Sequence, residues 1–283
     1  MAALRLYADS ACDLDRDILE KMGVGIFCLS TTIEDKTYYD RLDLSPTDFY
    51  KMIARPRVLP TTSQVSHAEF EQEFRRVMQE SDDDIIYIAF SSGLSGTYQS
   101  ACVARDQIDP LRITVIDSLS ASVGYALTVV RAARAIAQGM SKTEVIAEIE
   151  DNIRRIQHIF VVGNFEMLKR GGRVSATAAA LGNLLNIKMI CHFVDGKIIP
   201  LEKVHGDKKA KKRLLELMRE RGHDIPHQLI GINHSDDYQS ALELQRMVEL
   251  EFGCKEFLIS EVGTVIGSHV GAGSHSLFFL TPP

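Results

Sequence analysis

The sequence has few cysteines, and none of them has the spacing of a metal clasp or a redox dithiol. No two cysteines form a Cys-x-x-Cys arrangement, which excludes the common zinc clusters and thioredoxin-like motifs. An odd number of scattered cysteines is typical of reduced thiols in a protein core, so we expect a cytoplasmic protein. The five are Cys12, Cys28, Cys102, Cys191 and Cys254.

The sequence also lacks an excess of basic residues and any long apolar run. It contains 32 Lys and Arg against 38 Asp and Glu, a net charge of −6, so no basic surface for nucleic acid is expected. No stretch approaches the ~20 apolar residues that a membrane-spanning helix needs. Residues 1–10 lack the basic and apolar segments of a secretory leader. We therefore expect neither nucleic acid binding nor integral membrane insertion.

What remains is the composition of a folded α/β protein. The chain is 45% hydrophobic and 25% charged, and its 283 residues can form two units of about 140 residues each. In the first half, apolar runs alternate with helical patterns, which predicts a mostly parallel, doubly wound sheet in a domain of residues 1–156. The predicted strands are 4–8, 26–33, 85–90 and 113–116, and the helices are 14–22, 67–79, 98–107, 122–138 and 142–155.

The second half, residues 157–283, has a different pattern. An Asp-Gly pair at 195–196 separates two β-rich runs, which is typical of a hairpin and therefore of antiparallel strands. Helical patterns between further β-rich runs predict a mixed α/β sheet in this domain. The predicted strands are 159–162, 189–194, 197–201, 228–232, 256–261 and 277–280, and the helices are 207–221 and 238–252.

A hydroxyl-rich turn follows the strand predicted at 85–90. Its sequence is Ser91-Ser92-Gly93-Leu94-Ser95-Gly96-Thr97, and helix N–H groups at the carboxyl end of a strand favour an anionic ligand. Capping of the next helix by Ser95 or Thr97 is the plainer interpretation, but four hydroxyl residues and two glycines exceed what a cap needs. The Gly-x-Ser-x-Gly spacing of a hydrolase nucleophile is absent, so a ligand site is the favoured prediction.

Three further clusters combine small, polar and charged residues. The segment 60–64, Pro-Thr-Thr-Ser-Gln, carries hydroxyl groups for which helix capping is the alternative role. The segment 169–175 joins cations to paired glycines and suits a carboxylate or phosphate contact, or a surface turn. In the segment 263–273, glycines surround His269, which could point at a bound oxygen or serve a structural role.

Together these segments resemble the motifs of the DegV family, in the same order and over essentially the whole chain. The resemblance implies two α/β domains that hold one long-chain fatty acid, such as palmitate or oleate, at their interface. It places the acyl tail in an apolar tunnel of the second domain. The matching segments are Ala8-Asp9-Ser10, Thr62-Ser63-Gln64, Ser91 to Ala101, Ile116-Asp117-Ser118, Gly171-Gly172-Arg173, Gly206 to Ala210 and Gly267 to Gly273.

The resemblance also implies which residues bind the ligand. The family's carboxylate ligands fall on Thr62 and Ser95, and its nearby cation and imidazole fall on Arg173 and His269. Ser63 and Gly96 belong to the same motifs and complete the predicted set. A carboxylate that leaves water needs several donors, which these groups can supply. No catalytic residue, metal or cofactor is expected beside the bound fatty acid.

The family resemblance further implies a partner, an ATP-dependent fatty acid kinase that phosphorylates the presented carboxylate. The sequence has no Gly-x-x-x-x-Gly-Lys-Ser/Thr loop, so we do not expect it to transfer phosphate alone. One departure bears on this partner. The family's Lys-x-Arg-Gly reads Lys203-Val204-His205-Gly206 here, and His205 puts kinase docking in question.

Two other functions stay open at this point. A serine hydrolase or acyltransferase would use Ser95 as nucleophile and His269 as base, and a regulatory module would bind a phosphorylated metabolite through Arg173. Several apolar residues suit a lipid tunnel and a protein core equally well, with core the favoured prediction. They are Phe165, Leu181, Leu184, Leu185, Ile187 and Ile190.

Overall fold

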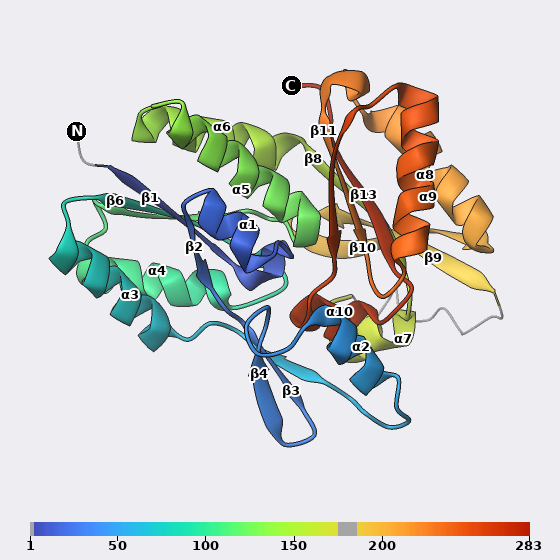
Figure 1. Ribbon diagram of the computed structural model, residues 1–283, viewed down its shortest axis with the longest axis horizontal. Coiled ribbons are helices and arrows are strands. Elements are labelled where there is room, and N and C mark those ends of the chain that lie inside the picture. Colours follow the sequence, from blue (N-terminus) through green and yellow to red (C-terminus); the bar gives the residue numbers. More distant parts are fainter. Residues whose placement is uncertain (1–2, 175–185) are drawn as a thin grey trace.

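The protein, seen here as a computed structural model that describes residues 3–174 and 186–283, contains two main β-sheets with helices around them (Figure 1). The first sheet is parallel, with strand order β2-β1-β6-β7. Its strands are β1 (Leu4–Asp9), β2 (Val24–Phe27), β6 (Asp84–Ala89) and β7 (Ile113–Asp117). The carboxyl ends of β1 and β6 mark the point where the strand order reverses, which is where such sheets bind ligands.

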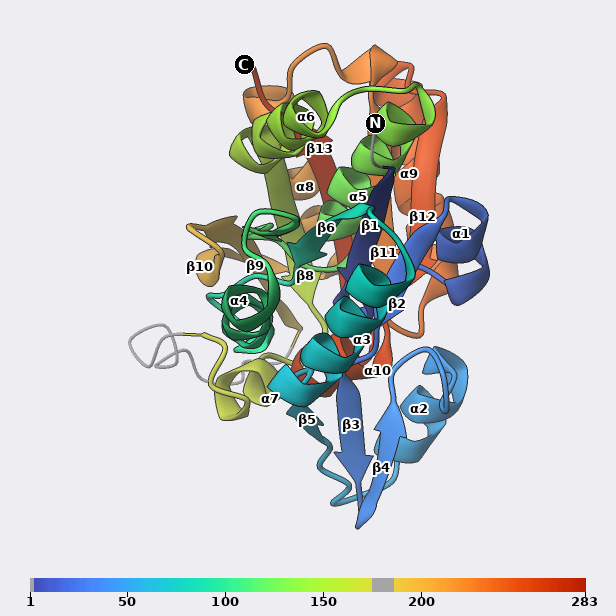
Figure 2. The ribbon, with the colours of Figure 1, turned by 90° about the vertical axis from the view of Figure 1, so that its left-hand side faces the viewer.

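Helices cover both faces of this sheet, as a doubly wound fold requires. Helices α3 and α4 pack together on one face, and α5 packs on β1 from the other, with α6 against it (Figures 1 and 2). Helix α3 begins with a capping box, in which Ser66 and Glu69 each bond the other's backbone N–H. The helices are α1 (Arg16–Lys21), α3 (His67–Glu80), α4 (Thr97–Ile108), α5 (Ser122–Ala137) and α6 (Lys142–Arg155).

The second sheet is mixed, with strand order β10-β9-β8-β13-β11-β12. Among its strands in the described residues, only β11 and β12 pair in parallel, and Asp195 and Gly196 form the predicted hairpin turn with φ of 48° and 73°. Helices α8 (Asp207–Arg221) and α9 (Tyr238–Phe252) pack on one face, and α5 packs on the other. The strands are β8 (Ile156–Val162), β9 (Ile187–Val194), β10 (Lys197–His205), β11 (Leu229–His234), β12 (Glu256–Glu261) and β13 (His275–Leu280).

The predicted α/β class, with a parallel sheet followed by a mixed sheet, is confirmed. The second sheet begins at Ile156, but the division into domains 1–156 and 157–283 stays a prediction. No helix in the described part of the chain is long and apolar enough to cross a membrane.

The single strand predicted at 26–33 is wrong, because this segment contributes to two different sheets. Strand β2 ends at Phe27, and β3 (Ser30–Ile33) joins β4 (Lys36–Tyr39) and β5 (Thr61–Ser63) in a small antiparallel sheet. At Leu29 the backbone N–H bonds to Ser10 Oγ at 3.1 Å, and the carbonyl accepts from Asp40 N at 2.9 Å. These bonds turn the chain away from the first sheet, and the β3–β4 hairpin extends from the body (Figure 2).

A short helix that the glycine-rich sequence concealed links the small sheet to the second half. This helix, α10 (Thr264–Val270), contacts β3, β5 and α2 (Pro46–Ile53), and also α7 (Phe165–Arg170). Its first backbone N–H, that of Thr264, donates to Asp40 Oδ1 at 2.8 Å, and the neighbouring Gly263 N donates to Asp13 Oδ1 at 2.8 Å. Carboxylates therefore fix the start of α10.

A buried arginine, Arg41, lies near both carboxylates and is in ion-pair contact with Asp13. Arg41 lies 3.6 Å from Asp13 Oδ1 with its side chain 4% exposed. Burial raises the pKa of Asp13 to about 7 and also raises the pKa of Asp40, while the charge of Arg41 lowers both. The negative charges of Asp13 and Asp40 therefore offset the cost of burying the Arg41 guanidinium.

Removing Asp40 should therefore cost much of the protein's stability. An Asp40→Ala variant loses both hydrogen bonds to Thr264 and removes a buried negative charge near Arg41. We expect a loss of about 3–5 kcal/mol in the free energy of unfolding, measured by urea denaturation. Asp35→Ala, at an exposed position in the β3–β4 turn, is the control, and equal small losses in both variants would contradict this role of Asp40.

Candidate functional site

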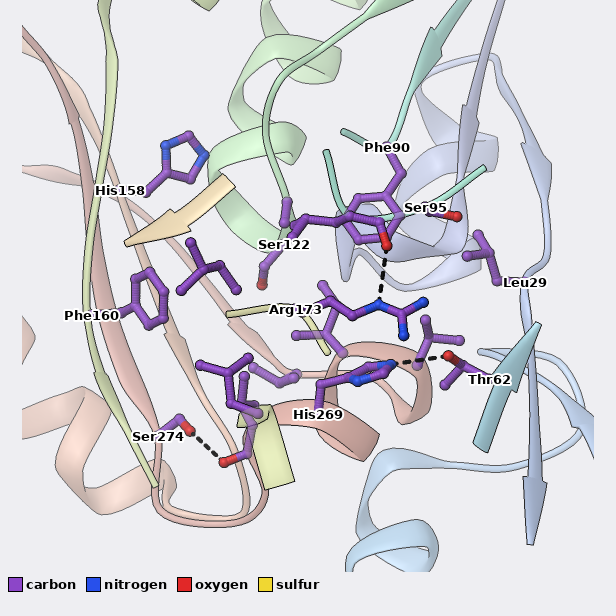
Figure 3. A pocket seen from close by; sticks show the side chains of 18 of the residues that line it. Leu29, Thr62, Phe90, Ser95, Ser122, His158, Phe160, Arg173, His269 and Ser274 are labelled. Atoms are coloured by element: carbon purple, nitrogen blue, oxygen red, sulfur yellow. Dashed lines mark hydrogen bonds between the residues drawn. The ribbon is translucent and has the colours of Figure 1, made fainter. Parts of the chain in front are cut away.

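A cavity of about 330 Å³ lies between the two halves of the chain, within the size range of small-molecule sites. Its wall includes residues of β5, the β6–α4 loop, α10 and the facing strands of the second sheet. In the view of Figure 3, Leu29 and Thr62 lie on one side of the cavity and His158 and Phe160 on the opposite side, with Arg173 and His269 between them. The cavity therefore brings together segments that are far apart in the sequence.

All six residues predicted as ligand-binding line this one cavity. They are Thr62 and Ser63 of β5, Ser95 and Gly96 before α4, Arg173 after α7, and His269 of α10. The structure thus brings the four sequence clusters together. Whether these side chains contact a ligand stays a prediction.

The imidazole of His269 is neutral at pH 7. Burial, with the nearby charge of Arg173, lowers the pKa of His269 to about 4. Its Nε2 and Thr62 Oγ1 share a hydrogen bond of 3.0 Å. A Cβ on Gly171 would lie 2.2 Å from His269 Nδ1, so glycine at 171 lets the ring approach the backbone closely.

Arg173 is a cation held by carbonyl groups. Its Nε donates to Leu94 O at 3.2 Å and its Nη1 donates to Gly171 O at 2.5 Å. Among the described residues, no carboxylate lies within 4.0 Å of its guanidinium. A guanidinium positioned in this way can form charge-assisted hydrogen bonds with an anion in the cavity.

Ser95 serves the helix that follows it and also faces the cavity. Its Oγ accepts from Thr97 N at 3.2 Å and shares a hydrogen bond of 2.9 Å with Thr97 Oγ1. The N-cap position of α4 is Gly96 and has no side-chain cap, so Ser95 binds the first helical N–H from one position earlier, and its side chain stays partly exposed at the cavity wall. Gly96, just before α4, lies close to the side chain of Gln64. A Cβ at position 96 would lie 2.1 Å from Gln64 Oε1, so a larger residue there would clash.

The pair required by the hydrolase alternative is not formed in this structure. His269 Nε2 bonds to Thr62, and Ser95 Oγ bonds to Thr97. A serine nucleophile is activated by a base within hydrogen-bonding reach of its hydroxyl, and His269 does not bond to Ser95 here.

Within residues 3–174 and 186–283, no three His, Cys, Asp or Glu side chains are grouped to hold a metal ion.

The opposite side of the cavity is mostly apolar and aromatic. His158 stacks on Phe193 with ring centroids 4.4 Å apart and meets Phe278 edge-on at 5.4 Å. Burial lowers the pKa of His158 to about 3, so this ring is also neutral at pH 7. Phe160 completes the aromatic wall, and the whole surface can hold a hydrocarbon chain.

The residues of this aromatic wall were not predicted from the sequence. For the apolar residues that suited a tunnel or a core equally well, the favoured core prediction is confirmed for Phe165 and Ile190, which pack into the two main cores. Neither they nor Ile187 line the cavity. The other three candidates, Leu181, Leu184 and Leu185, lie outside the described residues. The sequence signal for the wall is the alternation of side chains along a strand, because His158 and Phe160 of β8, and Ser276 and Phe278 of β13, are two positions apart and line the cavity.

Comparisons with known proteins agree with the sequence motifs. The model of the DegV family, a family described as uncharacterised proteins, matches residues 3–282. A DegV domain-containing protein of Caldanaerobacter subterraneus is 35% identical over 279 residues, which are 99% of each chain. A fatty acid-binding protein of Thermotoga maritima is 32% identical over 279 residues, which are 96% of this chain and 95% of that relative.

A solved structure gives the same result. The structure of a DegV family protein from Thermus thermophilus, described for its fatty acid binding, superimposes with a TM-score of 0.90 and 31% identity. The match covers 99% of this chain and 100% of that one. The chain therefore belongs to the DegV family, as its motifs predict.

Proposed function

We propose that this protein binds one long-chain fatty acid, such as palmitate or oleate, in the cavity between its two halves. The carboxylate lies among Thr62, Ser95, Arg173 and His269, and the acyl chain lies against the aromatic wall. The observation that carries this proposal is one cavity with a cation, hydroxyl groups and an apolar wall. The relatives named for fatty acid binding support it.

Energetics favour binding without a reaction. Burial of ~14 methylene groups at ~0.8 kcal/mol each gives about 11 kcal/mol before the costs of ordering and desolvation. At the other end, the guanidinium of Arg173 and the hydroxyls of Thr62 and Ser95 replace part of the carboxylate's hydration. The proposed role is that of a binding protein, with no catalytic residue, metal or cofactor.

The proposal is tested by ligand retention. Purified protein is stripped of lipid, incubated with radiolabelled palmitate or oleate, and separated from free ligand by gel filtration. We expect one equivalent of fatty acid to remain with the protein. Absence of retained label from a folded sample would reject the proposed function.

A bound carboxylate should also change the ionisation of His269. The pKa of His269 is lowered to about 4 by burial and by Arg173, and a nearby negative charge favours the protonated ring. We expect oleate to raise this pKa toward its ordinary value, as measured by NMR titration of labelled histidine. His158, on the aromatic side, is the internal control, and equal behaviour of the two rings would contradict a carboxylate beside His269.

We also propose that the bound acid is presented to a separate ATP-using kinase, which phosphorylates its carboxylate. Ser63 and Gln64 are exposed, and Thr62, Ser95 and Arg173 are half-buried, so the proposed carboxylate end is at the mouth of the cavity. His205 is exposed at the end of β10, next to the exposed Lys208 and Lys209 of α8, and could contact such a partner.

The kinase proposal is tested with oleate-loaded protein, ATP and the kinase subunit of a bacterial fatty acid kinase. Acyl phosphate is trapped with hydroxylamine and measured as the hydroxamate. If His205 hinders docking, His205→Arg should raise the rate. No product from either form, with an active control pair, would contradict presentation to this type of kinase.

A further inference from the structure

A small polar patch interrupts the apolar wall of the cavity. In the second sheet, Asn233 of β11 pairs directly with Ser276 of β13, which pairs in turn with Phe160 of β8. Side chains at paired positions of antiparallel strands share a face of the sheet and lie about 5 Å apart. Asn233, Ser276 and Phe160 all line the cavity, so this register places an amide and a hydroxyl beside an aromatic ring.

The hydrogen bonds around Asn233 fix the orientation of its amide. Ser122 Oγ donates to Asp13 Oδ2, so the same hydroxyl accepts from Asn233 Nδ2, at 2.7 Å. The Asn233 carbonyl oxygen therefore points away from Ser122. The buried Asp13 carboxylate, acting through Ser122, therefore leaves the oxygen of the Asn233 amide, and not its nitrogen, for another hydrogen-bond partner.

Two polar groups of the patch are left without partners. Asn233 is 4% exposed, and its Oδ1 is buried with no hydrogen bond. Ser276 is 5% exposed and lines the cavity, and none of the hydrogen bonds within the described parts of the chain involves its hydroxyl. Buried polar groups are nearly always hydrogen-bonded, and an unpaired acceptor next to an unpaired hydroxyl points to a polar guest.

We propose that Asn233 and Ser276 form a second polar subsite, which takes a hydroxyl group on the acyl chain of the ligand. This inference depends on the proposed fatty acid binding and adds a substrate class to it, the hydroxy fatty acids. The ligand hydroxyl donates to Asn233 Oδ1 and accepts from Ser276 Oγ. A second carboxylate would not fit, because it has no proton to donate to the amide oxygen and finds no cation in the patch.

An unsubstituted acid leaves both groups unpaired, whereas a hydroxy acid with the matching position pairs them. One satisfied buried hydrogen bond corresponds to a preference of about 10-fold. The preference depends on where the hydroxyl lies along the chain, because the carboxylate is fixed at the other side of the cavity. Hydroxyl groups at other positions would be buried against the aromatic wall and would weaken binding.

The test compares stearate with hydroxystearates that carry the hydroxyl at carbon 3, 10 or 12. Binding to the lipid-free full chain is measured by calorimetry. We expect at least one hydroxy acid to bind about 10-fold more tightly than stearate. In Ser276→Ala that preference should disappear, because the variant lacks the hydroxyl that pairs with the hydroxyl of the ligand. Ser268→Ala, a buried serine that does not line the cavity, should keep the preference.

The outcomes separate this inference from the proposed function. Weaker binding of every hydroxy acid than of stearate would overturn the inference and leave fatty acid binding intact. A preference that persists in Ser276→Ala would also overturn it. Failure of stearate itself to bind the wild-type chain would reject the proposed function, and with it the subsite. A melting temperature equal to that of the wild-type chain would show that Ser276→Ala is folded.

Discussion

Replacing Arg173 with glutamine is expected to weaken palmitate binding about 100-fold. The guanidinium is held toward the cavity by the carbonyls of Leu94 and Gly171, and the loss of one partner from a desolvated charge pair costs about 2–5 kcal/mol. Glutamine keeps a hydrogen-bonding group but removes the charge. The affinity for palmitate is measured by calorimetry on lipid-free protein.

The matched control is Arg170→Gln. Arg170 is exposed at the end of α7, three positions earlier in the chain, and does not line the cavity. We expect this change to leave the affinity for palmitate unaltered. Equal affinities in the two variants would show that Arg173 does not hold the carboxylate.

Affinity is also expected to rise steeply with acyl chain length. Each methylene group that leaves water contributes about 0.8 kcal/mol, so each added methylene should tighten binding about fourfold until the apolar part of the cavity is full. Between decanoate and palmitate the predicted gain is on the order of 1,000-fold. Dissociation constants for the even-numbered saturated acids, from displacement of a fluorescent fatty acid, give this slope.

A polar replacement in the aromatic wall is the companion experiment. Phe193 is partly buried and stacks on His158, so Phe193→Ser removes an aromatic face without adding a charge. We expect a weaker dependence on chain length in this variant. A wild-type affinity that does not depend on chain length would mean that the hydrocarbon stays outside the cavity.

The sequence was most informative about the two large sheets. Alternation of apolar runs with helical patterns predicted the parallel sheet, and the Asp195-Gly196 turn predicted the hairpin of the second sheet. The small β4-β3-β5 sheet was not predicted, because β5 has three residues and its Thr-Thr-Ser sequence also suits a cap. Strands this short have too few residues for a hydrophobic period.

Helix α10 could not be predicted from the sequence for a different reason. Its sequence contains glycine and follows another glycine, so local propensity argues against a helix. Contacts far away in the sequence determine its conformation, because Asp13 and Asp40 bind its first turn. Such contacts cannot be found from a local pattern.

For the candidate site, motifs located the polar side of the cavity and missed the aromatic wall. Thr62, Ser95, Arg173 and His269 occur in unusual clusters of small and polar residues, which a single sequence can reveal. The wall residues Phe160, Phe193 and Phe278 belong to ordinary strand patterns, and only the register of the second sheet assigns them to the cavity. The same holds for Asn233 and Ser276.

A crystal structure with 16-bromohexadecanoic acid tests the central claim most directly, because the bromine marks the end of the acyl chain by anomalous scattering. We predict the carboxylate within hydrogen-bonding distance of Thr62, Ser95 or Arg173, and the bromine on the side of the cavity formed by the aromatic wall. A ligand bound in the opposite direction, or found only on the outer surface, would contradict the account.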